Sequence, residues 1–404
     1  MGQAGQSHRT LRRSPGLRHV SPLLFRLTRA GCIPTGHDPR PRFPPRPGAC
    51  ALSGPETIAS ADAATRAGFD MVIDVRSPGE FAEDHVPGAV NLPVLDNAER
   101  AEVGTLYVQK SRFLARKIGG AYVARNISAH LLGALADQPG GFRPLVYCWR
   151  GGMRSGAMAH ILSQVGWRVG VLAGGYRTYR REVTARLYDS PPSFRAIVLD
   201  GPTGAGKTEV LRRLPALGVQ VLDLEGLAEH RGSLLGALPG RPQPAQKMFE
   251  SRLLGALEAL DPARPVVIEA ESSKVGERMV PPAVWTAMAE APSIRLEAPP
   301  EARAANLAGV YAETAGDVEA LMALLSRLPS KPGARRLSEW RALLEAGDLE
   351  PVALGLVETH YDPAYRRSSR QHERPELGRI DLAAVTGPEL DRAAEAVAAL
   401  VRAS

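Results

Sequence analysis

The sequence predicts an α/β protein with two successive parallel-sheet domains and a helical C-terminal region. Short apolar runs at 71–75, 144–148 and 167–172 are typical of buried parallel strands, and helical stretches separate them. A second series of such runs begins at 195–201. From about residue 302 onward we expect no strands, because the remaining chain shows only the apolar period of helices.

Four regions follow from this pattern. Residues 1–55 form an Arg- and Pro-rich tail, which we expect to be disordered. The first α/β domain covers 56–188, the second covers 189–310, and the helical region covers 311–404. Within the two domains we expect a helix at 154–165 and further strands at 219–225, 265–271 and 293–299.

Charge and cysteine content narrow the class of protein. The net charge of +7 is concentrated in the tail, because nine arginines and one acidic residue fall within residues 1–50. It is therefore weak evidence for nucleic-acid binding by the folded body. Three cysteines are too few for a disulfide framework, which fits a reducing compartment, and we expect the cytoplasm. An apolar run long enough for a membrane span does not occur in the sequence.

The stretch "VYCWRGGMRS" at 146–155 carries the first candidate site. Cys148 follows an apolar strand and precedes a Gly-rich loop and a helix. Backbone N–H groups of such a loop form an anion-binding nest, and Arg150 and Arg154 add fixed cations. These features favour the thiolate and make Cys148 a candidate nucleophile, whereas an inert buried thiol is the less favoured alternative.

The stretch "GPTGAGKT" at 201–208 carries the second candidate site, because it matches the P-loop pattern between a strand and a helix. Gly201, Gly204 and Gly206 would let backbone N–H groups approach phosphate oxygens. Lys207 would neutralise phosphate charge, and the Thr208 hydroxyl would ligate Mg²⁺.

Three carboxylates near strand ends are candidates for binding a metal ion or a phosphate group. Asp223 ends the run "VQVLD", and Glu269 lies in "PVVIEAE" where P-loop proteins usually place Asp. Glu271 follows two residues later and would point to the same side while the strand continues. A solvated carboxylate at a strand end explains each of them equally well.

Other polar side chains have open roles. Arg303 either reaches a phosphate or lies on a solvated helix face. His230 and Arg231 are candidates for lining the P-loop site. Two Arg-rich stretches, 176–186 and 365–374, could contact RNA, and the tyrosines of the first would suit base stacking. A solvated helix face explains both stretches equally well.

The first α/β domain resembles the rhodanese fold. The stretch "IDVRSPGEFAEDHVPGAVNLP" at 73–93 is similar to the opening motif of that fold, and "LAGGYRTYR" at 172–180 is similar to its closing turn. Asp84 departs from the pattern, because many rhodaneses have Gly there. The C-x5-R spacing from Cys148 to Arg154 makes a loop one residue longer than in many sulfurtransferases. That spacing also occurs in rhodanese-like phosphatases, so both chemistries stay open.

Taken together, the motifs resemble the tRNA 2-selenouridine synthase family. The resemblance covers roughly residues 60–310. Beyond the rhodanese motif it rests on "YCWRGGMRS", "DGPTGAGKT", "DLEGLAEHRGS", "QKMFE" and "VIEAESSKVG".

The resemblance implies an enzyme acting on the wobble uridine of tRNA. Such enzymes replace the 2-thio sulfur by selenium from selenophosphate, after alkylating the sulfur with the geranyl group of geranyl diphosphate. It implies that Cys148 carries selenium, that Arg150 and Arg154 hold selenophosphate, and that selenophosphate synthetase supplies the donor. Because the geranyl donor loses a diphosphate, we expect the P-loop to bind that diphosphate with Lys207 and Mg²⁺.

Two other classes of function remain to be compared. The first is a rhodanese-type sulfurtransferase or phosphatase fused to a small-molecule kinase. The second is a non-enzymatic RNA-binding adaptor, which is disfavoured because Cys148, Lys207 and Thr208 are all present.

Overall fold

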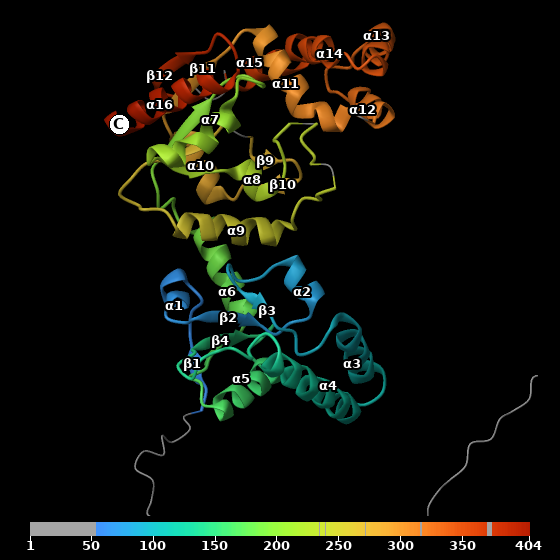
Figure 1. Ribbon diagram of the computed structural model, residues 1–404, viewed down its shortest axis with the longest axis vertical. Coiled ribbons are helices and arrows are strands. Elements are labelled where there is room, and N and C mark those ends of the chain that lie inside the picture. Colours follow the sequence, from blue (N-terminus) through green and yellow to red (C-terminus); the bar gives the residue numbers. More distant parts are fainter. Residues whose placement is uncertain (1–53, 234, 239, 271, 316, 370–373) are drawn as a thin grey trace, which may run out of the picture. The chain divides into compact units, whose positions relative to one another are not determined.

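The computed structural model describes residues 54–404 apart from residues 234, 239, 271, 316 and 370–373. These residues contain two five-stranded sheets whose strands all pair in parallel (Figure 1). The predicted α/β class, with two parallel-sheet domains and a helical C-terminal region, is therefore confirmed. The predicted disorder of the tail concerns residues that lie almost wholly outside the described part.

The first sheet has the strand order β1-β5-β4-β2-β3. Its strands are β1 (Glu56–Ile58), β2 (Met71–Asp74), β3 (Val90–Asn91), β4 (Pro144–Tyr147) and β5 (Gly170–Leu172). Its helices are α1 (Ala63–Ala67), α2 (Pro78–Glu83), α3 (Asn97–Gln109), α4 (Arg112–Leu132), α5 (Met153–Val165), α6 (Tyr176–Thr184) and the π-helix η1 (Ala185–Asp189).

Strand β4 is buried on both faces, as its uninterrupted apolar run predicts. Val146 belongs to a core cluster that includes Leu162 of helix α5. Its neighbours Leu145 and Tyr147 belong to a second cluster, which includes Tyr179 of helix α6. Because side chains alternate along a strand, the end of β4 is held from both sides, and Cys148 follows directly.

The second sheet has the strand order β12-β11-β6-β8-β7. Its strands are β6 (Ala196–Asp200), β7 (Gln220–Leu222), β8 (Val266–Glu269), β11 (Ser293–Glu297) and β12 (Glu376–Asp381). The connecting elements are α7 (Lys207–Arg213), η2 (Leu214–Leu217), α8 (Leu224–Ala228), α9 (Gln246–Glu258) and α10 (Pro282–Glu290). A two-stranded antiparallel hairpin, β9 (Lys274–Val275) and β10 (Arg278–Met279), follows β8.

One expectation about the C-terminal region is wrong. Strand β12 pairs in parallel with β11 at the edge of the second sheet, although no strand was expected beyond residue 302. As an edge strand it buries only Ile380, so it lacks the continuous apolar run of a central parallel strand. The final helix α16 (Gly387–Ala403) then packs its apolar side into the core that β6, β8 and β11 share.

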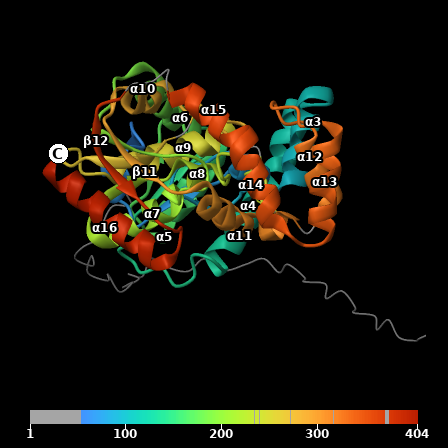
Figure 2. The same ribbon diagram turned by 90° about the horizontal axis from the view of Figure 1, so that it is seen from above.

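Between β11 and β12 the chain forms a group of helices, which confirms most of the predicted helical region. Its members are α11 (Pro300–Ala315), α12 (Val318–Leu325), α13 (Ala334–Glu345), α14 (Leu349–Leu356), the π-helix η3 (Val357–Tyr361) and α15 (Asp362–Ser369). Figures 1 and 2 both show α11 to α14 gathered together. They share an apolar core that includes Leu307, Trp340 and Leu356.

Helix α9 is joined to α6 and to η1 by ion pairs and a hydrogen bond. Arg180 forms an ion pair with Glu250 of α9, and Tyr188 donates a hydrogen bond of 2.6 Å to the same carboxylate. Arg186 pairs with Glu258 at 2.6 Å.

Within the described ranges, no helix has both the length and the apolar character needed to cross a membrane.

Candidate active site

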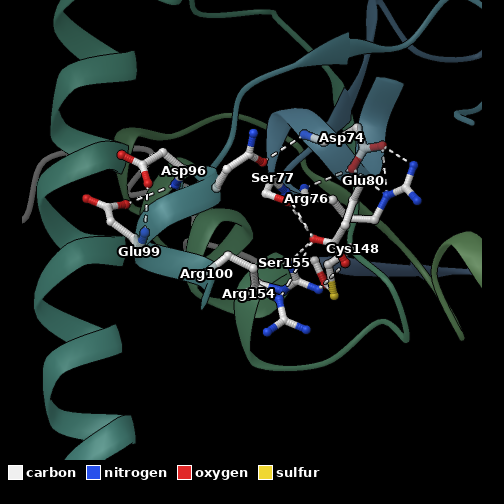
Figure 3. A network of polar contacts seen from close by, with 12 residues as sticks. Asp74, Arg76, Ser77, Glu80, Asp96, Glu99, Arg100, Cys148, Arg154 and Ser155 are labelled. Atoms are coloured by element: carbon white, nitrogen blue, oxygen red, sulfur yellow. Dashed lines mark hydrogen bonds and ion pairs between the residues drawn. The ribbon is translucent and has the colours of Figure 1, made fainter. Parts of the chain in front are cut away.

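Cys148 lies between the end of β4 and the start of α5, with only 3% of its surface exposed. Its Sγ accepts a hydrogen bond of 3.3 Å from the Gly152 N–H. It also accepts one of 3.2 Å from the Ser155 hydroxyl (Figure 3). The predicted anion-binding character of the loop therefore has a concrete basis in these donors. Ser155 was missed by the sequence reasoning, although it directly follows Arg154.

The donors around Cys148 change its acidity. Burial alone raises the pKa of the thiol, but hydrogen bonds from the Ser155 hydroxyl and from backbone N–H groups, including that of Gly152, outweigh this effect. The pKa of Cys148 therefore lies below its ordinary value. Because the thiolate is the nucleophilic form, Cys148 is reactive at a lower pH than an ordinary cysteine.

We expect the rate of Cys148 alkylation by iodoacetamide to rise with pH through a midpoint below that of a free cysteine peptide measured under the same conditions. Lowering the pKa extends the thiolate to lower pH, so removing a donor must move the midpoint upward. Ser155→Ala is expected to do so, whereas Ser163→Ala should not, because the Ser163 hydroxyl donates to the Ala159 carbonyl on the same helix. A wild-type midpoint at or above that of the free cysteine peptide would contradict this assignment.

The two arginines of the loop differ in their surroundings. Arg154 Nη1 lies 2.7 Å from Glu80 Oε2, and Glu80 also accepts from the Ser77 N–H at 3.1 Å (Figure 3). Burial acts to raise the pKa of Glu80, but Arg154 and Ser77 outweigh it and lower that pKa. Glu80 is therefore a carboxylate that fixes Arg154. Arg150 is exposed, and its predicted contact with selenophosphate stays a prediction.

The closing turn at 172–175 holds the loop in place. The Tyr176 N–H donates a 2.8 Å hydrogen bond to the Cys148 carbonyl. Gly175 has a φ of +58°, and a Cβ at this position would lie 2.1 Å from the same carbonyl oxygen. Only glycine fits here, because both the backbone conformation and the close approach exclude a side chain.

Asp84, the departure from the rhodanese pattern, is buried at 1% exposure. It accepts a 2.6 Å hydrogen bond from the Tyr176 hydroxyl and lies 3.6 Å from Arg180. Tyr176 and Tyr179 are both buried in the core. The suggestion that the tyrosines of 176–186 stack on RNA bases is therefore wrong, because they face the protein interior.

The P-loop adopts the expected conformation between β6 and α7. Gly201, Gly204 and Gly206 all have positive φ, and a Cβ on Gly201 would lie 2.4 Å from the Leu296 carbonyl oxygen. Lys207 Nζ donates a 2.9 Å hydrogen bond to the Gly201 carbonyl, so the lysine folds back over the loop. Its ammonium group also lies 3.8 Å from Glu269.

Thr208 brings two carboxylates together at the P-loop. Its hydroxyl oxygen lies 2.8 Å from Glu269 Oε2 and 3.2 Å from Glu225 Oε2. Burial raises the pKa of Glu269, whereas Lys207 and the Thr208 hydroxyl act to lower it. Glu225 was not predicted, although it lies within the quoted stretch "DLEGLAEHRGS".

Asp223, another predicted carboxylate, forms no hydrogen bond with Thr208 in the described part of the chain. Asp223 caps helix α8 by accepting a 2.7 Å hydrogen bond from the Gly226 N–H, and it does not line the P-loop cavity. Glu271 lies outside the described residues. Their roles at the phosphates stay predictions.

The oxygen atoms at the P-loop suit Mg²⁺, although no cluster of three or more His, Cys, Asp or Glu side chains occurs among the described residues. Magnesium prefers oxygen ligands and is usually held by one or two carboxylates together with substrate phosphates and water. Thr208, Glu269 and Glu225 provide one hydroxyl and two carboxylates at one point. Such an ion would offset the charge of a bound diphosphate.

Arg303 does not lie on a solvated helix face, and its contact with a phosphate stays a prediction. It is buried at 3% exposure, and its guanidinium forms two hydrogen bonds, of 2.7 and 2.9 Å, with Asp362. It also donates to the Thr203 carbonyl at 3.2 Å. Arg303 therefore ties the P-loop to helix α15, and we assign it a structural role.

We expect Arg303→Ala to lower the free energy of unfolding by about 3–5 kcal/mol, because it leaves Asp362 as an uncompensated, largely buried charge. Urea unfolding followed by circular dichroism measures this change. Arg335→Ala is the control, since the Arg335 side chain is 94% exposed, and its effect should stay within about 0.5 kcal/mol. Equal effects for the two variants would contradict the structural role of Arg303.

A cavity of about 990 Å³ opens from the P-loop. Its polar end contains Lys207, Thr208 and Glu269, and Arg231 also lines it, as expected. His230 is not among the lining residues. The remaining wall mixes acidic, cationic, hydroxyl, aromatic and aliphatic side chains, among them Asp200, Glu376, Arg295, Trp285, Leu307, Val310 and Tyr311.

Comparisons with known proteins agree with this arrangement. Residues 57–182 match the family model of the rhodanese-like domain, and residues 194–325 match that of the tRNA 2-selenouridine synthase AAA domain. A tRNA 2-selenouridine synthase of Cupriavidus pinatubonensis is 33% identical over 350 residues, which cover 78% of this chain and 93% of the relative. One of Pseudomonas syringae is 32% identical over 334 residues, which cover 75% and 89%. The chain belongs to the tRNA 2-selenouridine synthase family.

Proposed function

We propose that this chain replaces the sulfur of a wobble 2-thiouridine in tRNA by selenium, after S-geranylation of that sulfur. The observation that carries the proposal is that one chain contains both a buried cysteine with N–H and hydroxyl donors at its Sγ and a separate P-loop cavity lined by Lys207 and Thr208. The names of the relatives support the substrate and the selenium product. We place the reaction in the cytoplasm, where tRNA is available.

The geranyl half of the reaction is assigned to the P-loop cavity. The 2-thio sulfur attacks C1 of geranyl diphosphate, the C–O bond breaks, and diphosphate leaves. Lys207 and the P-loop N–H groups stabilise the negative charge that develops on the leaving group. Mg²⁺ held by Thr208, Glu269 and Glu225 would add a second positive charge there.

The wall of the cavity suits a ligand with one ionic and one apolar end. Leu307 and Val310 of α11 line it, together with Tyr311. Leu307 and Tyr311 also line a smaller apolar cavity of about 40 Å³, whose other walls are Leu, Val and Ala side chains, all of them from the helical group except Leu235. A diphosphate at the P-loop would therefore direct a prenyl chain toward apolar surface.

The selenium half is assigned to the Cys148 loop. Selenophosphate, supplied by selenophosphate synthetase, is an anion that the loop N–H groups and the arginines Arg150 and Arg154 can bind. The low pKa of Cys148 provides a nucleophile beside that anion. The tRNA must therefore present one uridine to both sites.

The test uses the purified chain and an anticodon stem–loop RNA with 2-thiouridine at the wobble position. With geranyl diphosphate alone, we expect the S-geranyl nucleoside by mass spectrometry. With geranyl diphosphate and selenophosphate together, we expect 2-selenouridine. Equal selenium incorporation without geranyl diphosphate would contradict the proposed route. ATP hydrolysis without geranyl transfer would favour the sulfurtransferase or phosphatase fused to a kinase.

A further inference from the structure

Electron balance restricts what Cys148 can do in the selenium half of the reaction. Selenophosphate holds its selenium on pentavalent phosphorus. If the Cys148 thiolate took the selenium, an S–Se bond would form and phosphorus would leave two electrons reduced, as phosphite. Transfer of that selenium to C2 of the base would give a C2–Se–S linkage to Cys148. Release of 2-selenouridine from this linkage would then need an external reductant. The proposed function supplies none.

No reductant is needed when the selenium attacks carbon directly. The selenium of selenophosphate bonds to C2 of the S-geranylated base, the C2–S bond breaks, and geranyl thiolate leaves and takes up a proton from water. The uridine then carries selenium with the phosphoryl group still attached. No electrons are gained or lost, but one Se–P bond remains to be broken.

We propose that Cys148 breaks this bond by attacking phosphorus, so that the loop acts as a selenium-specific phosphatase. An S–P bond forms, the Se–P bond breaks, and its electron pair passes to selenium to give 2-selenouridine. Water then attacks the phosphocysteine, the S–P bond breaks, and inorganic phosphate leaves while the Cys148 thiolate re-forms. This inference rests on the proposed function, because it assigns one step of that reaction.

The geometry of the loop supports attack on phosphorus. The C-x5-R spacing from Cys148 to Arg154 gives the loop room for a tetrahedral phosphoryl group, whose oxygens the loop N–H groups can bind. Cys148 is almost wholly buried, so the phosphorus must enter this loop to meet Sγ. The Gly152 N–H and the Ser155 hydroxyl now point at Sγ. They stabilise the same negative charge when the thiolate is the leaving group of the second step.

Arg154 is held in a fixed orientation in which it can bind the phosphoryl group during transfer. Two of its nitrogens lie 2.7 and 3.4 Å from the Glu80 carboxylate, so the guanidinium plane is fixed before substrate arrives. Its remaining N–H groups are available for phosphoryl oxygens, since one guanidinium has five donors. Glu80 is therefore a positioning residue that acts through Arg154.

The charge state of Glu80 also explains the expected specificity. Its pairing with Arg154 keeps it ionised, so it is not a proton donor for a leaving group. An alkyl phosphate needs such a proton donor, because an alkoxide is a poor leaving group. A uridine selenide carries its negative charge on a large atom and into the base, so it leaves without protonation.

The experiment uses the full chain, ³²P-labelled selenophosphate and an anticodon stem–loop RNA that already carries S-geranyl-2-thiouridine. We expect wild type to give 2-selenouridine with transient ³²P on the protein. Cys148→Ser should accumulate a selenium-containing nucleoside one phosphoryl group heavier than 2-selenouridine. Ser155→Ala should accumulate ³²P-protein, because losing one charge-assisted donor slows hydrolysis roughly 10- to 100-fold. Ser163→Ala on the same helix should behave as wild type.

The outcomes distinguish a failure of this inference from a failure of the proposed function. If Cys148→Ser leaves the RNA at the S-geranyl stage without selenium, Cys148 acts before carbon–selenium bond formation, and this inference is wrong while the proposed function stands. If Cys148→Ser yields normal 2-selenouridine, the inference is also wrong. A wild-type protein that puts no selenium into the geranylated RNA contradicts the proposed function itself, and the inference with it.

Discussion

Lys207→Ala is expected to lower the rate of geranyl transfer roughly 10²- to 10³-fold. The Lys207 ammonium lies over the P-loop, 2.9 Å from the Gly201 carbonyl and 3.8 Å from Glu269. It is therefore placed to neutralise a diphosphate that leaves from this site. The measurement is the yield of S-geranyl nucleoside from 2-thiouridine RNA and geranyl diphosphate over time.

Lys247→Ala is the matched control for this variant. Lys247 lies on helix α9, has a 45% exposed side chain, and pairs with Glu83 instead of lining the cavity. Its geranyl transfer should equal that of wild type. If Lys207→Ala retains geranyl transfer while Lys247→Ala loses it, the P-loop is not the diphosphate site.

Cys148→Ser is expected to lower the yield of 2-selenouridine by about 10³-fold or more, because a nucleophile is lost. Geranyl transfer should be unchanged, since Cys148 lies in the first sheet domain and does not line the P-loop cavity. Nucleoside analysis of RNA treated with both donors measures the two products together. Loss of geranyl transfer in this variant would show that the two half-reactions are not separate.

The sequence predicted the parts of both sites that lie within one local motif. The P-loop residues from Gly201 to Thr208 are contiguous, so their spacing alone specifies the turn and its contacts. The Cys148 loop was predicted for the same reason. Central strands were also predictable, because burial on both faces requires an uninterrupted apolar run.

Contacts between distant segments could not be predicted in the same way. Arg303 meets Asp362 across 59 positions of sequence, and Thr208 meets Glu225 across 17. Nothing in the local pattern around Arg303 indicates a partner, so a phosphate contact and a solvated face fitted it equally well. Asp84 differs in that its departure from the rhodanese pattern was visible. Its burial against Tyr176 shows that the departure is a structural feature.

Edge strand β12 was missed because only Ile380 is buried in it. The tyrosines of helix α6 were misjudged because of the arginines between them. Their alternation with arginines resembles an exposed RNA-binding face, but Tyr176 and Tyr179 lie inward while Arg177 and Arg181 are exposed. Helical period, counted from the buried tyrosines, separates the two faces.

The P-loop cavity and the Cys148 loop are proposed to perform separate steps on one uridine. The decisive measurement gives each variant RNA that already carries S-geranyl-2-thiouridine, together with selenophosphate. We expect Lys207→Ala then to make 2-selenouridine at the wild-type rate, because the step it lacks has been bypassed, while Cys148→Ser still makes none. If Lys207→Ala stays inactive on the geranylated RNA, the P-loop is needed for the selenium step and the separation is contradicted.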